Sequence, residues 1–143
     1  MTFLVASLVF VLDRLTKIAV TSSMSYGQSR AILPKIFHFT FVLNNGTAFG
    51  LLKGQNAFLA AVSASAAILI IIYVMRHRTL KPVVSSALGL ILGGALGNLF
   101  DRIRFGYIID FLDFRVWPVF NIADSAITIG MFILVIMLCT RSS

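Results

Sequence analysis

The sequence contains very few acidic residues and almost no cysteine. Its five acids are all aspartate, against twelve Lys and Arg, which gives a formal net charge of +7. The single cysteine, Cys139, excludes an intrachain disulfide, and the two histidines, His38 and His77, are far apart in the sequence. A metal site built from His and Cys is therefore not expected, and we predict no metal and no cofactor.

Charged residues of both signs are also scarce. They make up 12% of the chain, whereas 59% is hydrophobic and the mean hydropathy is +0.97. This composition excludes an ordinary soluble domain. A helix needs roughly 20 mostly apolar residues to cross a bilayer. Residues 56–75 and 82–100 meet this length without a charge, and residues 119–140 meet it with a single charge, Asp124.

A further membrane helix is predicted over residues 2–21, although charged residues interrupt it. Its apolar part, Thr2–Leu12, covers only about 17 Å at ~1.5 Å per residue, so a spanning helix must include Asp13–Lys17. A cleaved signal peptide is the alternative, but no basic residue precedes the apolar core and no small-x-small cleavage site follows it. We therefore expect an all-α membrane protein with four transmembrane helices, forming a single integral membrane domain over residues 1–143.

Residues 36–43 have the pattern of a strand. Three phenylalanines alternate there with polar or smaller residues, and the turn signal Asn44-Asn45-Gly46 follows. We predict a small β-element over about residues 30–50, between the first and second helices, lying at the membrane interface. His38 is expected to be a solvated or hydrogen-bonded strand residue rather than a catalytic one.

The loop at residues 76–81, RHRTLK, is short and strongly basic, which is typical of a cytoplasmic loop, although the opposite side carries more basic residues in total. Alternating helix directions then place the end of the first helix on the same face as the segment between the third and fourth. All five aspartates are thus predicted to gather at one membrane surface. Attraction to anionic lipid headgroups explains the positive charge more simply than nucleic acid does.

The third helix carries a ridge of small residues. Gly89, Gly93 and Gly97 recur every four residues, with Gly94 beside them. This spacing is typical of helices whose backbones approach closely, so we predict tight packing of a second helix against this ridge.

Two aspartates lie in apolar sequence that does not need them for solubility. An ionised carboxylate at the depth of Asp124 is costly unless it is paired or hydrated, although Asp124 or Asn121 can instead cap the helix. Asp110 lies in the apolar segment YIIDFLDF, and Trp117-Pro118 can turn the chain back between the two. Two close carboxylates can share a proton, so that one activates a water and the other binds a scissile carbonyl. Asp113 is an alternative to Asp110.

Other polar residues are interpreted as support for this pair. Asn98, Asp101 and Arg102 lie on neighbouring faces at the end of the third helix, where Arg102 can pair with Asp101 or bind a lipid phosphate. Asp13 and Lys17 form an i,i+4 pair of opposite charge, for which structural pairing is favoured over catalysis.

Five short motifs together resemble the lipoprotein signal peptidase (signal peptidase II) family of bacterial inner-membrane aspartic peptidases. They occur in the family's order and extend from residue 13 to residue 125. The motifs are DRLTK (13–17), NNGTAFG (44–50), GNLFDR (97–102), Asp110-Phe111 with the upstream Gly106, and FNIADS (120–125).

The resemblance implies a four-helix inner-membrane enzyme with a periplasmic β-cradle and an active site at the periplasmic face. Its substrate would be a diacylglyceryl-modified prolipoprotein, cut just before the lipidated cysteine, and globomycin would inhibit it. Membrane lipids would be its other partners, nucleic acid would not be one, and a monomer is expected. The implied catalytic pair is Asp110 and Asp124, and Phe49 is expected to help cover the cleft. The implied site-shaping residues are Asp13, Lys17, Asn44, Gly46, Asn98, Asp101, Arg102, Asn121 and Ala123.

Two other interpretations compete with a peptidase. One is a small proton- or cation-coupled carrier that uses Asp110 and Asp124 as relay groups, and the other is a structural bundle whose acids only cap helices. Carriers usually hold such charges near the midplane within broken helices, whereas these acids are predicted at one surface. Under either alternative, Asp124→Asn has no hydrolysis to abolish.

Overall fold

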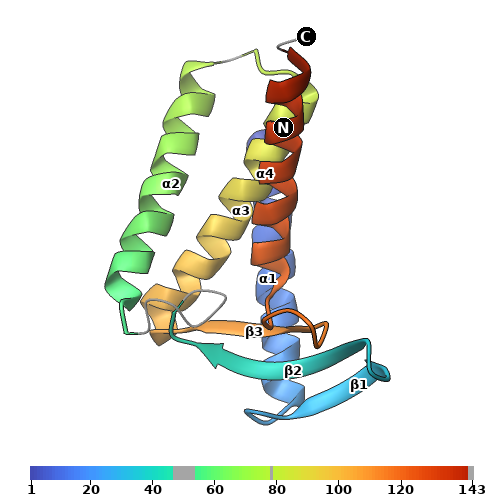
Figure 1. Ribbon diagram of the computed structural model, residues 1–143. Coiled ribbons are helices and arrows are strands. Elements are labelled where there is room, and N and C mark those ends of the chain that lie inside the picture. The colour runs from blue at the N-terminus through green and yellow to red at the C-terminus, as the bar shows by residue number, and fades with distance from the viewer. Residues whose placement is uncertain (47–53, 78, 142–143) are drawn as a thin grey trace.

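The computed structural model describes residues 1–46, 54–77 and 79–141. Four helices lie along one another, and a small sheet closes one end of the bundle (Figure 1). Met1, the end of the last helix and the connection between the second and third helices all lie at the other end, as alternating helix directions predict. The elements in chain order are α1 (Thr2–Ser23), β1 (Ser29–Leu33), β2 (Phe37–Asn44), α2 (Asn56–Arg76), α3 (Pro82–Phe105), β3 (Ile108–Asp113) and α4 (Ile122–Arg141).

Three helices of the described residues, α2, α3 and α4, are long and apolar enough to cross a membrane. The helix predicted near residues 2–21 is present as α1, but it does not belong to this group. Every 18-residue stretch of α1 contains Asp13, Arg14 and Lys17, so its composition alone does not mark it as a membrane span. The predicted membrane-spanning character is thus confirmed for three of the four helices.

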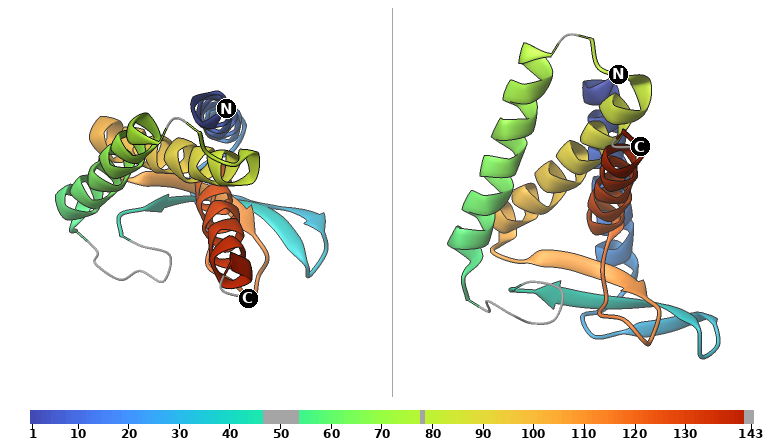
Figure 2. Two further views of the ribbon diagram at one scale, coloured as in Figure 1. Left: turned by 90° about the horizontal axis from the view of Figure 1, so that it is seen from above. Right: turned by 45° about the horizontal axis from the view of Figure 1, so that its top comes forward.

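The helix α3 is the centre of the bundle. It packs against each of the other helices, with α1 and α4 on opposite sides of it (Figure 2). A Cβ atom on Gly89 would lie 2.6 Å from the backbone oxygen of Thr2 in α1, and one on Gly94 would collide with the backbone oxygen of Ala123 in α4. The predicted tight packing against the glycine ridge is confirmed, and it involves a helix on each side.

The sheet differs from the predicted β-element in extent. Its strands are antiparallel in the order β1-β2-β3, so its third strand comes from the segment between α3 and α4. The predicted β-element between the first two helices is confirmed as β1 and β2, and the strand that the prediction did not include is β3. Residues of β3 are buried on both faces, and a short strand of this kind lacks the alternation that identified β2. Of the predicted range 30–50, residues 47–50 lie outside the described part of the chain.

Two predicted helix ends also required correction. The third helix continues past residue 100 to Phe105 and ends at Gly106, whose φ of 82° is left-handed and suits glycine. The fourth helix begins at Ile122 rather than at residue 119, because the side chain of Asn121 caps its first turn.

An apolar cluster attaches the sheet to the end of α1. Val20 and Met24 contact Phe41 of β2 and two residues of β3, Ile109 and Phe111, and all five side chains are buried. Because Ile109 and Phe111 flank Asp110, this packing fixes the position of the strand that carries that acid.

Candidate functional site

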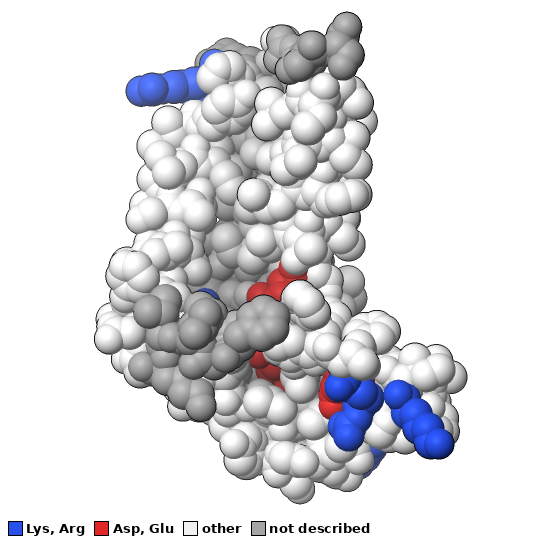
Figure 3. Space-filling model, in the orientation of Figure 1, with Lys and Arg blue, Asp and Glu red and all other residues white. Residues whose placement is uncertain are grey.

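A cavity of about 280 Å³ lies where α2, α3 and α4 approach the sheet. Asp110 of β3 and Asp124 of α4 both line it, and so do Asn98 and Arg102 of α3. Figure 3 shows the corresponding hollow between α2 and α4, with acidic atoms near its lower end. Most of the other lining is apolar. The site thus combines two acids with walls of hydrocarbon.

Asp110 is almost completely buried, with 1% of its surface exposed. The side-chain amides of Asn44 and Asn121 donate hydrogen bonds to its two oxygens, at 2.9 Å and 2.7 Å. Burial, reinforced by the nearby charge of Asp124, raises the pKa of Asp110 to about 7, although the two amides and Lys17 act in the opposite direction. This carboxyl can therefore hold a proton close to neutral pH.

Asp124 lies in the first turn of α4 and points into the same cavity. Asn98 donates a hydrogen bond to its carboxylate at 2.7 Å. The backbone N–H of Asp124 donates to the side-chain oxygen of Asn121 at 2.9 Å, so the capping role falls to Asn121. The carboxylate of Asp124 remains directed at the cavity.

Two asparagines join the acids. The amide nitrogen of Asn121 that donates to Asp110 also donates to the side-chain oxygen of Asn98 at 3.2 Å. The amide nitrogen of Asn98 in turn donates to Asp124. The sequence Asp110–Asn121–Asn98–Asp124 is thus a continuous hydrogen-bonded chain contributed by β3, α3 and α4. It fixes the orientation of both carboxylates with neutral groups.

A cluster of buried charges supports this chain from behind. The ammonium of Lys17 lies 2.9 Å from Asp13 and 2.7 Å from Asp101, and all three side chains are completely buried. Lys17 also donates to the side-chain oxygen of Asn98 at 3.1 Å, and Asp13 accepts the backbone N–H of Ala123 at 3.1 Å. The predicted pairing of Asp13 with Lys17 is confirmed, and the cluster connects α1 to α3 and α4.

Arg102 does not form an ion pair with Asp101, which was one of its two predicted partners. Its guanidinium donates to the backbone oxygen of Gly46 at 3.1 Å, while Asp101 binds Arg14 and Lys17. The backbone N–H of Gly46 donates to the side chain of Asn44 at 2.9 Å. Arg102 therefore holds the end of β2 over the cavity and places a positive charge at its wall.

Asp113 does not join the other acids. It accepts hydrogen bonds from Thr40 at 2.6 Å and from the backbone and side chain of Arg115 at 2.8 Å and 3.1 Å. Although burial opposes the change, these bonds lower the pKa of Asp113. It is held on the sheet and does not line the cavity, so the alternative pairing of Asp113 with Asp124 has no support.

Two other sequence expectations concern the sheet. His38 accepts or donates a hydrogen bond at 3.1 Å with Ser29, which agrees with the predicted hydrogen-bonded strand residue. Phe49, expected to help cover the cleft, lies outside the described residues.

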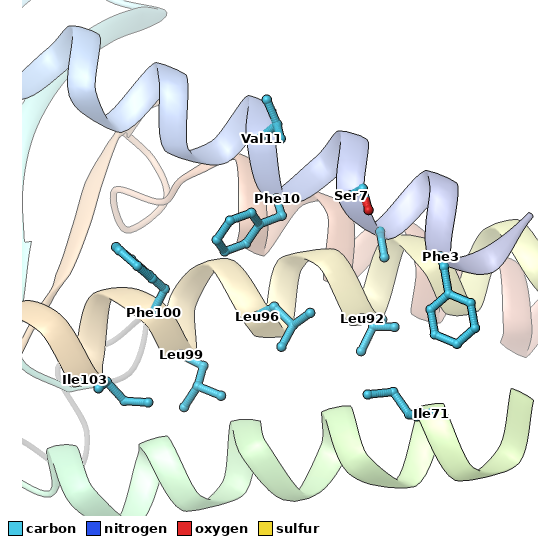
Figure 4. Close-up of a pocket in the computed structure, with 11 residues that line it drawn as sticks. Phe3, Ser7, Phe10, Val11, Ile71, Leu92, Leu96, Leu99, Phe100 and Ile103 are labelled. Atoms are coloured by element: carbon cyan, nitrogen blue, oxygen red, sulfur yellow. The ribbon is translucent and has the colours of Figure 1, made fainter. Parts of the chain in front are cut away.

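A second cavity, of about 550 Å³, lies on another side of α3, between α1 and α2. Figure 4 shows that rings and aliphatic side chains such as Phe10, Phe100 and Ile71 surround it. None of the five aspartates lines this cavity. Within the described ranges, no three His, Cys, Asp or Glu side chains are grouped to hold a metal ion.

Arg14 is part of the site's support but was not among the predicted site residues. Its guanidinium lies 2.5 Å from Asp101 and above the ring of Phe100, at 4.8 Å from the ring centre. The only signal was its position inside DRLTK, between the two members of the predicted ion pair. Its contact with Asp101 joins residues 87 positions apart, which spacing along one helix cannot indicate.

Comparisons with known proteins are consistent over nearly the whole chain. The profile of the family Peptidase_A8, signal peptidase (SPase) II, matches residues 5–140. A lipoprotein signal peptidase of Halothermothrix orenii is 43% identical over 138 residues, which cover 96% of this chain and 94% of that protein. One from Paraburkholderia phymatum is 48% identical over 139 residues, covering 92% and 82%. A solved bacterial membrane enzyme is 32% identical with a TM-score of 0.93, covering 99% of this chain and 89% of its own.

Proposed function

Because this chain belongs to the signal peptidase II family and is an aspartic endopeptidase that removes the signal peptides of lipoproteins, we propose that Asp110 and Asp124 are its catalytic pair. The observation that carries this proposal is that the two acids line one cavity and are joined through Asn121 and Asn98. The substrate is a diacylglyceryl-modified prolipoprotein, cut just before its lipidated cysteine.

The proposed chemistry needs one proton shared between the two acids. The raised pKa of Asp110, about 7, supports a singly protonated pair at neutral pH. The ionised member takes a proton from a water, which attacks the scissile carbonyl, while the protonated member donates to the carbonyl oxygen. The tetrahedral intermediate then breaks its C–N bond, and the amine of the cysteine leaves with a proton from the pair.

Arg102 is proposed to assist at the cavity wall. Its guanidinium is fixed by the backbone oxygen of Gly46 and keeps further N–H donors. A positive charge held near two acids favours the form of the pair with one ionised member, and it stabilises negative charge on the reacting carbonyl. Asn44, at the end of β2, donates a hydrogen bond to Asp110 of β3 and so orients that acid.

We propose that α1 also crosses the membrane, which completes four spans. Its charged residues Asp13 and Lys17 are completely buried against α3, so lipid does not contact them. The side chains that α1 exposes include Leu4, Leu8 and Ile18, each at least 60% exposed. An apolar outer surface with paired charges inside is suited to a bilayer.

The location of the site also suits a lipid-modified substrate. The acids lie at the sheet end of the bundle, and the basic loop of residues 76–81 at the other end indicates the cytoplasmic side. The proposed site is therefore at the periplasmic face of the inner membrane. A cysteine whose acyl chains remain in the bilayer brings its scissile bond to that depth. The enzyme is proposed to act as a monomer.

Cleavage of a purified diacylglyceryl-modified prolipoprotein by the enzyme in lipid nanodiscs tests this proposal. Asp110→Asn and Asp124→Asn should each abolish cleavage. Asp113→Asn is the matched control, since it removes an aspartate from the same strand without changing the cavity, and it should retain cleavage. The unmodified prolipoprotein should not be cut, and globomycin should block the reaction. Retained cleavage in either of the first two variants would remove that residue from the pair.

A further inference from the structure

We propose that Arg14 is a positioning residue for both acids of the site. It acts through Asp101 and Lys17 and contacts neither the substrate nor the attacking water. It does not line the cavity that holds Asp110 and Asp124. The effect on activity rests on the proposed function, whereas the effect on the strand can be measured without any substrate.

The contacts of Asp101 divide its two oxygens between separate tasks. Arg14 occupies Oδ1 at 2.5 Å. Oδ2 is left for the ammonium of Lys17 at 2.7 Å and for the backbone N–H of Ile109 at 3.3 Å. The guanidinium is itself held above the ring of Phe100, and the Arg14 side chain is only 13% exposed, so the plane of the guanidinium is fixed. Arg14 therefore sets the rotation of the Asp101 carboxylate.

That rotation reaches Asp110 by a short path. Ile109 lies near the start of β3 and directly precedes Asp110. Its backbone N–H donates to the carboxylate of Asp101 in α3. A carboxylate turned away from this N–H leaves a buried donor without its partner and frees the strand to shift. Arg14 thus helps to determine where β3 presents its acid.

A second path reaches Asp124 through Lys17. Lys17 forms ion pairs with Asp13 and Asp101 and donates a hydrogen bond to Asn98, and Asn98 donates to Asp124. With Arg14 present, the group of Asp13, Arg14, Lys17 and Asp101 contains two acidic and two basic side chains. Without Arg14, Lys17 must balance two carboxylates alone, which draws it toward Asp101 and away from Asn98.

The comparison of Arg14→Gln with Arg104→Gln tests this inference. Both variants lose one positive charge near the sheet end, but Arg104 is exposed and is matched only in charge. Arg14→Gln should lower kcat about tenfold, equivalent to about 1.4 kcal/mol in the barrier, with KM changed less than about twofold. Arg104→Gln should leave both unchanged. Arg14→Lys, which restores the charge without the planar fork, should recover part of kcat.

Hydrogen exchange of the Ile109 amide, measured by NMR in nanodiscs, gives the substrate-free readout. Arg14→Gln should speed this exchange more than that of other amides in β3, and Arg14→Lys should speed it less. If Arg14 contributes only to folding, the thermal midpoint falls while kcat per folded molecule and the relative exchange of Ile109 stay at wild-type values, and the inference is overturned. If Arg14→Gln does not fold, the same two measurements on Arg14→Lys decide. If the wild-type enzyme does not cleave the prolipoprotein, the proposed function is refuted. The exchange rate of the Ile109 amide would still show whether Arg14 positions β3.

Discussion

Asp13 and Asp101 are buried as deeply as Asp110, yet these aspartates are bound by different kinds of partner. Asp13 and Asp101 contact the cations Lys17 and Arg14 directly. Asp110 and Asp124 instead contact side-chain amides. A direct cation forms an ion pair that holds helices together, whereas a neutral amide orients a carboxylate without supplying an opposite charge. This difference separates the acids of the buried ion pairs from the two acids that we propose as catalytic.

The largest effect that distinguishes the two groups is on activity. Asp110→Asn and Asp124→Asn should each reduce kcat by about a thousandfold or more, since no second group can replace either proton-transfer partner. Their thermal midpoints should stay within about 5 °C of the wild type, because asparagine keeps the size and much of the hydrogen bonding. Cleavage rates and thermal unfolding of the same preparations provide the measurement. A midpoint that falls with the activity would make these acids structural as well, and the comparison would fail.

The next effect should appear in stability. Lys17→Met leaves Asp13 and Asp101 buried with one cation fewer, and it should destabilise the fold by about 3–5 kcal/mol. Unfolding in a denaturing detergent, followed by circular dichroism, measures this loss. Lys81→Met, which removes an exposed lysine at the other end of the bundle, is the control and should change stability by less than about 0.5 kcal/mol. An equal loss in both variants would show that the buried cluster has no special role.

The pH dependence of cleavage should follow the titration of Asp110. The pKa of Asp110, raised to about 7, means that the pair keeps its proton below this pH and loses it above. The rate should therefore fall as the pH rises above about 7, approaching tenfold per unit. Measurements of kcat between pH 5 and 9 on a substrate of fixed composition would show this limb. A rate that rises between pH 7 and 9 would exclude a shared proton.

The smallest effect concerns the tuning of this limb. Asn44 donates to Asp110, and this bond lowers the pKa of that acid. Asn44→Ala should thus move the alkaline limb to higher pH, with a reduction in kcat of less than about tenfold. Thr40→Val, which removes the donor to Asp113, should leave the limb where it is. A shift to lower pH in Asn44→Ala would contradict an amide that acts by stabilising the charged form.

The helix α1 was predicted from the length that a span needs, because Asp13–Lys17 interrupt its apolar run. The apolar runs alone were sufficient to predict α2, α3 and α4, since membrane spans differ strongly from other sequence in composition. Their ends were not, because the start of α4 depends on a single contact between the Asn121 side chain and the N–H of Asp124. The strand β3 was missed for a similar reason. The strand β3 pairs with β2, which is distant in the sequence: Asn44 of β2 and Asp110 of β3 are 66 positions apart. Both faces of β3 are also buried.

The site was predictable where a residue was out of place in its surroundings. Asp110 and Asp124 could be identified because an acid in apolar sequence is costly and is not needed for solubility. The Asp13–Lys17 pair could be identified in DRLTK from its helical i,i+4 spacing alone. The partners of Arg14 and Arg102 could not be foreseen, since opposite charges within four residues suggest local pairs and the fold chose distant ones. Which cation meets which carboxylate is decided by the packing of α1 on α3.

The double use of Asn121 has a consequence for inhibitors. One end of its side chain starts α4, and the other end binds Asp110. Fraying of the first turn of α4 would therefore release Asp110 from its hydrogen bond with Asn121. A compound that binds Asp110 in its present position would in turn stabilise that first turn. Potency against this enzyme should then rise with the rigidity that a compound confers on the opening residues of α4, a property that spectroscopy can rank before any kinetic assay.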